Sequence, residues 1–404
     1  MAVDGLRLDG RQMTAREGSP PIPAPPARAA QLPGPASTGN ATPHNSVARN
    51  VGTARTASGE RPTAAEKYWP ESGRKEHLAM ATTTNTTAGD ELHVIFGTGP
   101  LGLATARVLV ARGKRVRMVN RSGRAPDGQA VPARVEIRRG DATDPASTRE
   151  VCTGATAVYQ CAQPAYTEWV EKFPPLQAGV LEGAAAVGAK LIVAENLYMY
   201  GPHDGPLTEE LPYAARTRKG ETRARMAEAV SEAHRGGKVR TTAGRGADFF
   251  GPGVLDSVLG ERVFPPLLAG KRASAIGNID LPHTYTFIED FGRALATLGE
   301  REEALGQAWH VPNAETRTTR QLVTLAFEQA GLKPKVSGMG GLMMRLGGLV
   351  IPEARETVEM MYEFERPFVV DHGRYARAFG GEATPHPEAI ERTLDWYRTH
   401  AGGH

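Results

Sequence analysis

Phe96-Gly-Thr-Gly-Pro-Leu-Gly102, written FGTGPLG, is the stretch that decides the fold. Its glycines have the G-x-G-x-x-G spacing of a turn that binds a dinucleotide. The preceding ELHVIF predicts a buried strand, LGLATARVLVARG predicts a helix that ends at Gly113, and RVRMVN at Arg115–Asn120 predicts a second strand. This strand–turn–helix–strand order is the context that the spacing requires, so we predict a nucleotide-binding turn.

Each glycine has its own role in such a turn. Gly97 permits the tight bend, Gly99 lets the backbone approach a pyrophosphate, and Gly102 lets the helix pack against the strand. The amino terminus of the helix then faces the phosphates. The plainer alternative is a strand-to-helix turn without a ligand. The predicted cradle consists of Gly97, Thr98, Gly99, Pro100, Leu101 and Gly102.

The end of the second predicted strand decides between NAD(H) and NADP(H). An acidic residue there would accept a hydrogen bond from the ribose 2′-hydroxyl of NAD. The chain instead has Asn120, followed by Arg121 and Arg124. Guanidinium groups pair with a 2′-phosphate, so the sequence favours NADP(H) over NAD(H). The alternative is two arginines on a solvated turn.

Further strand patterns alternate with helical ones along the next part of the chain. This alternation predicts an α/β fold with a Rossmann-type doubly wound parallel sheet over residues 90–250. We expect residues 251–404 to form a smaller mixed α/β region. The strand patterns are ARVEIRRGDATD at 133–144, AVYQCAQPA at 157–165, AKLIVAENLYMYG at 189–201 and KVRTTAGRGADFFGPG at 238–253.

Residues 1–89 have a different composition, rich in Pro, Ala, Thr, Ser, Arg and Gly. Stretches such as SPPIPAPPARAAQLPGPAS cannot bury enough apolar surface to offset the entropy of ordering them, so we predict a disordered extension. GRKEHLAM at Gly73–Met80 suggests a second hypothesis, because Arg-Lys-Glu can be encoded by a purine-rich ribosome-binding sequence. Translation would then start at Met80, in a bacterium of high GC content. The intact mass of the native protein tests this.

The composition argues against several classes of protein. The net charge is +3, and no Lys/Arg block interleaves with aromatic residues, so nucleic-acid binding is not indicated. Cys152 and Cys161 form no CxxC pair, and the sequence shows no secretory leader and no apolar run that could span a bilayer. We therefore expect a cytoplasmic protein with no membrane partner. His283 has no partner at metal-ligand spacing, and no metal site is predicted.

Together these segments resemble the short-chain dehydrogenase/reductase superfamily of the extended or atypical type, often described as the NAD-dependent epimerase/dehydratase family. The resemblance runs from roughly Leu92 to His400. GDATD stands where the family contacts adenine, QCAQPAY where its fourth strand passes the cofactor, and LYMYG where its fifth strand ends in V-Y-G. The resemblance implies cofactor contacts from Asp141, Ala142, Cys161, Ala162 and Gln163.

The chain departs from that family at the catalytic positions. Asn196 stands where the family has Ser or Thr, and the Tyr-x-x-x-Lys dyad aligns with Lys219 and Arg223. Asn196 has an amide donor for a developing oxyanion, and Arg223 has charge to hold the ribose. Like-charge repulsion from Arg223 would ease the loss of a proton from Lys219, which makes Lys219 a candidate general acid. The alternative is that both cations lie on a solvated helix face.

Two tyrosines are further candidates for the proton donor. Tyr198 and Tyr200 end the predicted fifth strand, and period-two alternation places them on one side of it. Either hydroxyl could replace the missing tyrosine. The alternative is core packing with a satisfied hydroxyl.

The resemblance places Phe249, Phe250, His283 and Tyr285 near the substrate. A structural role is the alternative for His283. A predicted helix at Met339–Leu349 and the segment PEARETVEMMYEFERPF would roof the pocket. The methionines of this region would make an adaptable apolar wall, which favours a largely apolar substrate, although ordinary core packing also accounts for them. They are Met339, Met343, Met344, Met360 and Met361.

The sequence therefore predicts an NADP(H)-dependent oxidoreductase of the atypical short-chain type. It would act on a carbonyl or alcohol carbon of a small, largely apolar metabolite, for example one of secondary metabolism. Two alternatives stay open: an epimerase, dehydratase or isomerase on the same scaffold, and a non-catalytic NADP(H)-sensing regulatory protein. A homodimer is also expected from the resemblance, because pairing through two helices is common in that family.

Overall fold

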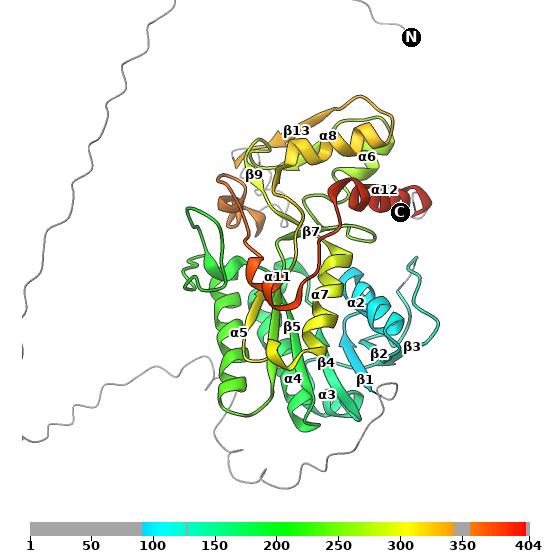
Figure 1. The fold of residues 1–404 in the computed structure, drawn as a ribbon, viewed down its shortest axis with the longest axis vertical. Helices are drawn as coiled ribbons and strands as arrows, with labels where there is room; N and C mark the ends of the chain where they lie inside the picture. Colours follow the sequence, from blue (N-terminus) through cyan, green and yellow to red (C-terminus); the bar gives the residue numbers. More distant parts are fainter. Residues whose placement is uncertain (1–90, 127, 342–343, 345–355, 401–404) are drawn as a thin grey trace, which may run out of the picture. The chain divides into compact units, whose positions relative to one another are not determined.

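The centre of the fold is a seven-stranded sheet in which every pairing is parallel. The computed structural model describes residues 91–126, 128–341, 344 and 356–400. The strand order is β11-β6-β5-β4-β1-β2-β3 (Figure 1). Successive strands are added on one side of β1 up to β3 and on its other side from β4 onward, so the order of addition switches between β1 and β4. The strands are β1 (Leu92–Phe96), β2 (Arg115–Asn120), β3 (Val135–Arg139), β4 (Ala155–Gln160), β5 (Lys190–Glu195), β6 (Thr241–Arg245) and β11 (Ala308–His310).

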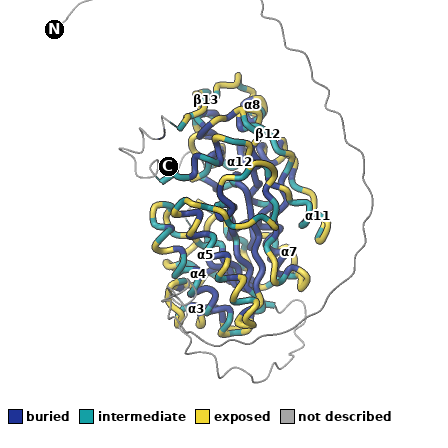
Figure 2. The backbone as a smooth tube through the Cα atoms, turned by 90° about the vertical axis from the view of Figure 1, so that its left-hand side faces the viewer, coloured by how far each residue is buried: buried dark blue, intermediate teal, exposed yellow. Residues whose placement is uncertain are grey.

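Helices cover both faces of this sheet because its strands are apolar on both sides. Ile95 packs with the helices of one face, whereas its neighbours Val94 and Phe96 pack with those of the other. The strands accordingly form the buried middle layer (Figure 2). The prediction of a Rossmann-type doubly wound sheet is confirmed. One face carries α2 (Pro100–Ala111) and α7 (Ile288–Glu300), and the other α3 (Pro145–Cys152), α4 (Trp169–Ala186) and α5 (Arg218–Arg235).

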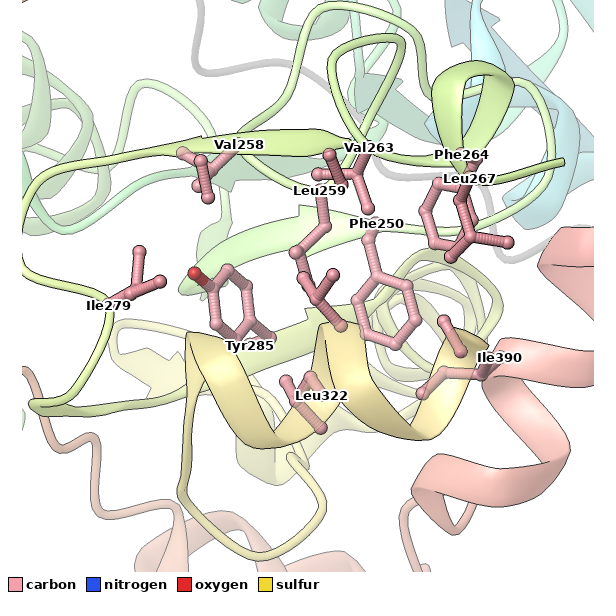
Figure 3. Close-up of a cluster of buried hydrophobic side chains, with 14 of the residues drawn as sticks. Phe250, Val258, Leu259, Val263, Phe264, Leu267, Ile279, Tyr285, Leu322 and Ile390 are labelled. Atoms are coloured by element: carbon pink, nitrogen blue, oxygen red, sulfur yellow. The ribbon is translucent and has the colours of Figure 1, made fainter. Parts of the chain in front are cut away.

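The later part of the chain forms a smaller mixed α/β region with its own apolar core. Three short strand pairs belong to it: β7–β10, β8–β13 and β9–β12. Phe250, Phe264, Tyr285 and Leu322 meet in this core (Figure 3). Its elements are β7 (Asp248–Phe250), α6 (Phe264–Leu268), β8 (Ala273–Ile276), β9 (Pro282–His283), β10 (Tyr285–Phe287), β12 (Arg317–Thr318), α8 (Thr319–Gln329), β13 (Val336–Met339), η5 (Met361–Glu363) and α12 (His386–His400). Helix α11 (Gly373–Phe379) packs instead beside β11 of the main sheet.

The two regions are interleaved along the chain. Helix α7 and strand β11 both come after residue 250, yet they pack on and extend the main sheet. The smaller region collects at one end of that sheet (Figure 1). Residues near the end of β7 and β10 therefore stand between the two cores.

The predicted fifth strand is wrong at its carboxyl end. Strand β5 stops at Glu195, and Tyr198–Tyr200 form a 3-10 turn, η3. The Asn196 side-chain oxygen accepts a hydrogen bond from the Tyr198 amide at 3.4 Å, and the Tyr200 amide donates to the Leu197 carbonyl. These local bonds replace the ladder, so the two tyrosines do not share one side of a strand.

The predicted helix at Met339–Leu349 is wrong at its first residue, because Met339 ends β13 and pairs with Ile276 of β8. Residues 342–343 and 345–355 lie outside the described residues, as do residues 1–90 with the predicted extension and the start at Met80. Within the described ranges, the helices are too short or too polar to cross a membrane.

Candidate active site

The glycine turn after β1 is shaped by two close backbone approaches. Gly97 has φ of 107°, and a Cβ on it would stand 2.7 Å from the Ala162 amide nitrogen. A Cβ on Gly102 would overlap the Gly97 carbonyl oxygen. Both positions therefore require glycine. Gly97 needs it for its positive φ and for the close approach of Ala162, and Gly102 needs it because no space is left for a side chain.

Gly99 differs from its two partners, because a Cβ on it would meet nothing within 4 Å. Helix α2 begins directly after it with Pro100, and no side chain caps its first turn. Uncapped amides at a helix amino terminus favour an anion. Open space at this terminus therefore fits a pyrophosphate. Leu101, the next residue, packs into the core.

Asn120 joins the end of β2 to the glycine turn. Its Nδ2 donates to the Thr98 hydroxyl at 3.0 Å and to the Arg124 carbonyl at 2.8 Å, while its Oδ1 accepts from the Gly123 amide at 2.6 Å. Arg121 and Arg124 are exposed beside it. Neither guanidinium forms an ion pair with any described residue. The loop thus carries two free cations and no carboxylate at the position that selects the cofactor.

Asp141 follows β3 on the neighbouring loop. Hydrogen bonds from the Thr143 hydroxyl and amide, with the nearby Arg121 guanidinium, lower the pKa of Asp141. A Cβ on Gly179 of α4 would overlap the Ala142 carbonyl oxygen, so this helix passes close to the loop. Asp141 and Arg121 therefore lie near each other at the rim of the expected adenosine site.

The segment after β4 meets the glycine turn directly. The Cys161 amide donates to the Phe96 carbonyl at 2.9 Å, and Ala162 touches Gly97, whereas Gln163 is exposed. Burial raises the pKa of the Cys161 thiol to about 12, so this thiol is a poor nucleophile. The predicted cofactor residues after β1 and β4 are thus brought together where the strand order reverses, which is where ligands bind in such sheets.

Lys219 and Arg223 lie on the first turns of α5, which Thr217 caps by accepting a hydrogen bond from the Gly220 amide. Both are only 1% exposed, so the alternative of a solvated helix face is wrong. Arg223 lies over the Phe173 ring, 4.8 Å from its centroid, and its Nη2 is 3.7 Å from Glu195 Oε1. This cation is therefore part of the buried layer under the end of β5.

The close partners of Lys219 are carboxylates. The sequence had suggested that repulsion from Arg223 would dominate instead. Its Nζ pairs with Glu356 and, at 3.0 Å, with Glu359. The same atom lies 4.5 Å from the centroid of the Tyr166 ring. This bonding weakens the argument for Lys219 as a free proton donor.

The two candidate tyrosines have different surroundings. The Tyr200 hydroxyl accepts from Arg245 at 2.6 Å and bonds His310 Nε2 at 2.9 Å, within a buried network. Tyr198 is half-buried near Tyr166, and burial, with a smaller electrostatic effect of Tyr166, raises the pKa of Tyr198 well above its usual range. Tyr200 has a satisfied structural hydroxyl, whereas Tyr198 belongs to a tyrosine pair beside Lys219.

Asn196 has a donor to spare. Its Nδ2 is buried and has no hydrogen-bond partner in the part of the chain that the structure describes. Leaving such a donor unpaired costs about 1–3 kcal/mol. A substrate oxygen is a suitable acceptor for it.

Several residues of this site were missed from the sequence. They lie on separate elements, for example Asp248 in β7 and Tyr166 in a 3-10 turn, and only their acidic or aromatic character could have marked them. Three come from a segment more than 130 residues after Lys219, so no local pattern links them to it. The missed residues are Tyr166, Asp248, Glu356, Glu359 and Glu363.

The sequence and the fold both resemble those of known proteins. The family model described as "NAD dependent epimerase/dehydratase family" matches residues 94–311, more than half of the chain. The chain belongs to this family. The family consists of NAD-dependent epimerases and dehydratases, so the chain is an enzyme that uses a nicotinamide dinucleotide. This membership argues against the non-catalytic sensing alternative.

Solved structures of this family have the same fold. An epimerase from Methanothermobacter thermautotrophicus has a TM-score of 0.66 and 16% identity, over 77% of this chain and 93% of that chain. UDP-glucuronic acid 4-epimerase from Bacillus cereus has a TM-score of 0.63 and 14% identity, over 76% and 99%. dTDP-glucose 4,6-dehydratase from Bacillus anthracis has a TM-score of 0.63 and 12% identity, over 76% of this chain and 97% of that chain. A search of curated protein sequences found no significant match.

The family's dinucleotide fits the residues present. Gly97, Gly99 and the start of α2 would hold the pyrophosphate, because the turn is open only at Gly99. Asp141 lies where the adenine is expected, and Asn196 has an unpartnered donor at the end of β5. No group of three or more His, Cys, Asp or Glu side chains in the described ranges could hold a metal.

The four predicted substrate residues separate into two groups. Phe250 and Tyr285 lie in the core of the smaller region, where the Tyr285 hydroxyl bonds Thr319 at 2.8 Å (Figure 3). Phe249 is half-buried against Phe291. His283 Nε2 bonds Asp248 Oδ2 at 2.9 Å, which connects this histidine to the site.

Two members of the predicted methionine wall are core residues. Met344 and Met361 pack in the core of the smaller region, which is the alternative that the sequence left open. Met360 is buried and accepts a weak hydrogen bond from Thr217. Met343 lies outside the described residues.

Proposed function

We propose that the enzyme is an NADP(H)-dependent oxidoreductase that transfers hydride between the cofactor and a carbonyl or alcohol carbon of a small metabolite. One observation supports it most: an open phosphate cradle, a spare amide donor on Asn196 and the Tyr166–Tyr198 hydroxyl pair belong to loops that follow β1, β4 and β5. The carboxyl ends of parallel strands share one edge of the sheet, so we expect these groups to face a common site.

The preference for NADP(H) rests on the loop after β2. Asn120 uses its side chain to hold the loop, so it is not free to select a ribose hydroxyl. Arg121 and Arg124 are exposed, and a 2′-phosphate would give both a partner. Solved relatives such as the Bacillus cereus epimerase bind NAD, so this preference would be a departure from them.

The proposed proton donor is Tyr198. The bound cofactor would supply hydride chemistry at the substrate carbon. Tyr198 would give its proton to the oxygen of that carbon, and the Tyr166 hydroxyl would stabilise the phenolate by hydrogen bonding. Asn196 Nδ2 would hold the same oxygen as it gains negative charge. Lys219 remains the alternative donor. The sequence predicts that Arg223 holds the ribose, but its burial against Phe173 and Glu195 disfavours that role.

An epimerase or dehydratase is the second candidate function, and family membership favours it. Such an enzyme returns its cofactor unchanged after each turnover, whereas an oxidoreductase consumes it. Nicotinamide absorbance during turnover distinguishes the two. A small-molecule substrate, a cytoplasmic location and a homodimer complete the proposal.

Fluorescence titration with NADPH and NADH tests the proposal first. We expect NADPH to bind at least tenfold more tightly than NADH, because two guanidinium groups meet its 2′-phosphate. Equal affinity would remove the NADP(H) assignment. Failure of both cofactors to bind would contradict the whole proposal.

A further inference from the structure

Two carboxylates of a distant segment hold the buried ammonium group of Lys219. Its Nζ pairs with Glu356 and, at 3.0 Å, with Glu359, and its side chain is 1% exposed. Arg218, the preceding residue, pairs with Glu356 at 3.1 Å, and its amide donates to Glu359 at 3.1 Å. A buried lysine requires such partners, because an unpaired ammonium group is far more stable in water than inside a protein. The segment with the two glutamates therefore stays in place as long as Lys219 stays buried.

The same ammonium group touches the proposed substrate site. Lys219 Nζ lies 4.5 Å from the centroid of the Tyr166 ring, which meets the Trp169 ring at 5.1 Å. The Trp169 ring in turn meets the Tyr198 ring at 5.8 Å. A continuous row of contacts thus joins the two glutamates to the proposed proton donor.

Residues 356–363 are attached to the rest of the protein differently from residues 364–371. Within the described ranges, no hydrogen bond between backbone groups joins 356–363 to another segment. Side chains hold it: the ion pairs, the Met360 sulfur that accepts from the Thr217 hydroxyl at 3.7 Å, and Met361 in the core. Residues 364–371 are instead fixed by backbone bonds to Asn278, Pro282, Thr284 and Leu207. A segment without such bonds opens at a lower free-energy cost than one built into the fold.

The surroundings of Asn196 show why some segment must move. Its Nδ2 is buried and has no hydrogen-bond partner among the described residues. A substrate oxygen can reach this donor only after a covering segment has moved. Leu197, the next residue, packs in one cluster with Phe368 and Val370, so the chain that follows residue 363 passes beside Asn196.

We propose that residues 356–363 form a lid over the substrate site, and that Arg218 and Lys219 are its clasp. The lid pivots at Phe364, where backbone bonds begin to hold the chain. Opening parts both glutamates from the clasp, hydrates Lys219 and admits the substrate, whereas closing restores the pairs and excludes water. The proposal rests on the proposed function, because it takes Asn196 and Tyr198 as groups that meet the substrate.

Hydrogen exchange of the full chain, read by mass spectrometry, tests the lid without a substrate. We expect the amides of 356–363 to exchange at least tenfold faster than those of 364–371. Glu356→Gln combined with Glu359→Gln removes the partners of the clasp and should accelerate exchange in the lid at least a further tenfold, with 364–371 unchanged. Glu365→Gln is the control, because this exposed carboxylate pairs with no cation in the described part of the chain, and it should match the wild type.

A cross-link tests whether the lid controls access. Thr217→Cys and Met360→Cys place two thiols where these side chains now touch, and a bismaleimide joins them. Burial raises the pKa of the native Cys152 and Cys161 thiols to about 12, so they react slowly. We expect the joined protein to bind NADPH as before and to turn over a carbonyl substrate found by screening at least tenfold more slowly. The same variant treated with N-ethylmaleimide, which cannot bridge, should keep its turnover.

Two results would overturn the proposal: equal exchange of the two segments, or full turnover by the joined protein. If the double glutamine variant does not fold, adding Lys219→Met removes the ammonium group left without partners, and this triple variant takes its place. NADPH affinity is measured in the same samples. A protein whose lid opens as expected but that binds no NADPH would contradict the proposed function and leave the lid standing.

Discussion

The turn after β1 and the start of α5 both belong to the proposed site, and they are built by opposite means. The turn uses glycines and backbone amides, and its geometry depends on the space that absent side chains leave. The start of α5 uses buried charged side chains, Lys219 and Arg223, each held by carboxylates from other segments. Backbone geometry tolerates almost no substitution, whereas charged side chains can be exchanged together with their partners. We therefore expect substitutions to be tolerated less well in the glycine turn than at the start of α5.

The largest loss of stability should come from Gly102, where an added Cβ would have no room. Gly102→Val would press a branched side chain against the Gly97 carbonyl, so we expect loss of the native fold or destabilisation of more than about 3 kcal/mol. Urea denaturation measures it. Gly99→Ala is the matched control, because open space surrounds that position. The control should keep its stability and lose affinity for NADPH. Equal stability of both variants would contradict the packing argument.

The other side of the comparison is tested at the tyrosine pair. Tyr198→Phe removes the proposed proton donor and should lower kcat by about 10²–10⁴-fold with NADPH affinity unchanged. Steady-state kinetics on a screened substrate measures it. Tyr200→Phe is the control, since its hydroxyl bonds Arg245 and His310. It should lose about 1–3 kcal/mol of stability and keep most of its kcat. The opposite pattern would make Tyr200 the donor.

The features set by neighbours along the chain could be predicted from the sequence. The strands and the glycine turn could be predicted because periodicity and spacing are local properties: Arg115–Asn120 is β2 as expected. The position of Asn120 and the exposure of Arg121 also agree with the sequence. These features depend on neighbours along the chain.

Long-range pairing could not be predicted. Nothing near Lys219 indicates that Glu356 and Glu359 neutralise it, because the partners are about 140 residues away. The end of β5 was missed for a local reason: the Asn196 side chain competes with the ladder for the backbone. Burial of Arg223 was missed because Phe173 and Glu195 lie on other elements.

A smaller effect is expected at the cofactor-selecting loop. Arg121→Asp should weaken the binding of NADPH about 10–100-fold and change that of NADH at most a few-fold, because only NADPH carries the 2′-phosphate that Arg121 would contact. Fluorescence titration measures both affinities. Arg115→Asp at the opposite end of β2 is the control for a change of net charge. Parallel losses for NADPH and NADH would show that Arg121 shapes the loop rather than recognising the phosphate.

The smallest effect concerns the buried network behind Tyr200. His310 lies wholly buried between Tyr200 and the Asp371 carbonyl, and burial lowers its pKa to about 4. The unfolded chain therefore binds a proton near pH 6.5 that the folded chain refuses until about pH 4. Stability then falls as pH drops through this window, and the loss attributable to His310 from pH 7 to 5 is about 2 kcal/mol. His310→Gln should show a correspondingly shallower decline in urea denaturation. His93, also buried with a pKa of about 4, stays in both proteins and cancels in the comparison. An unchanged slope would mean that His310 is protonated in the fold, which would place a second cation beside Arg245 and oppose the network described for Tyr200.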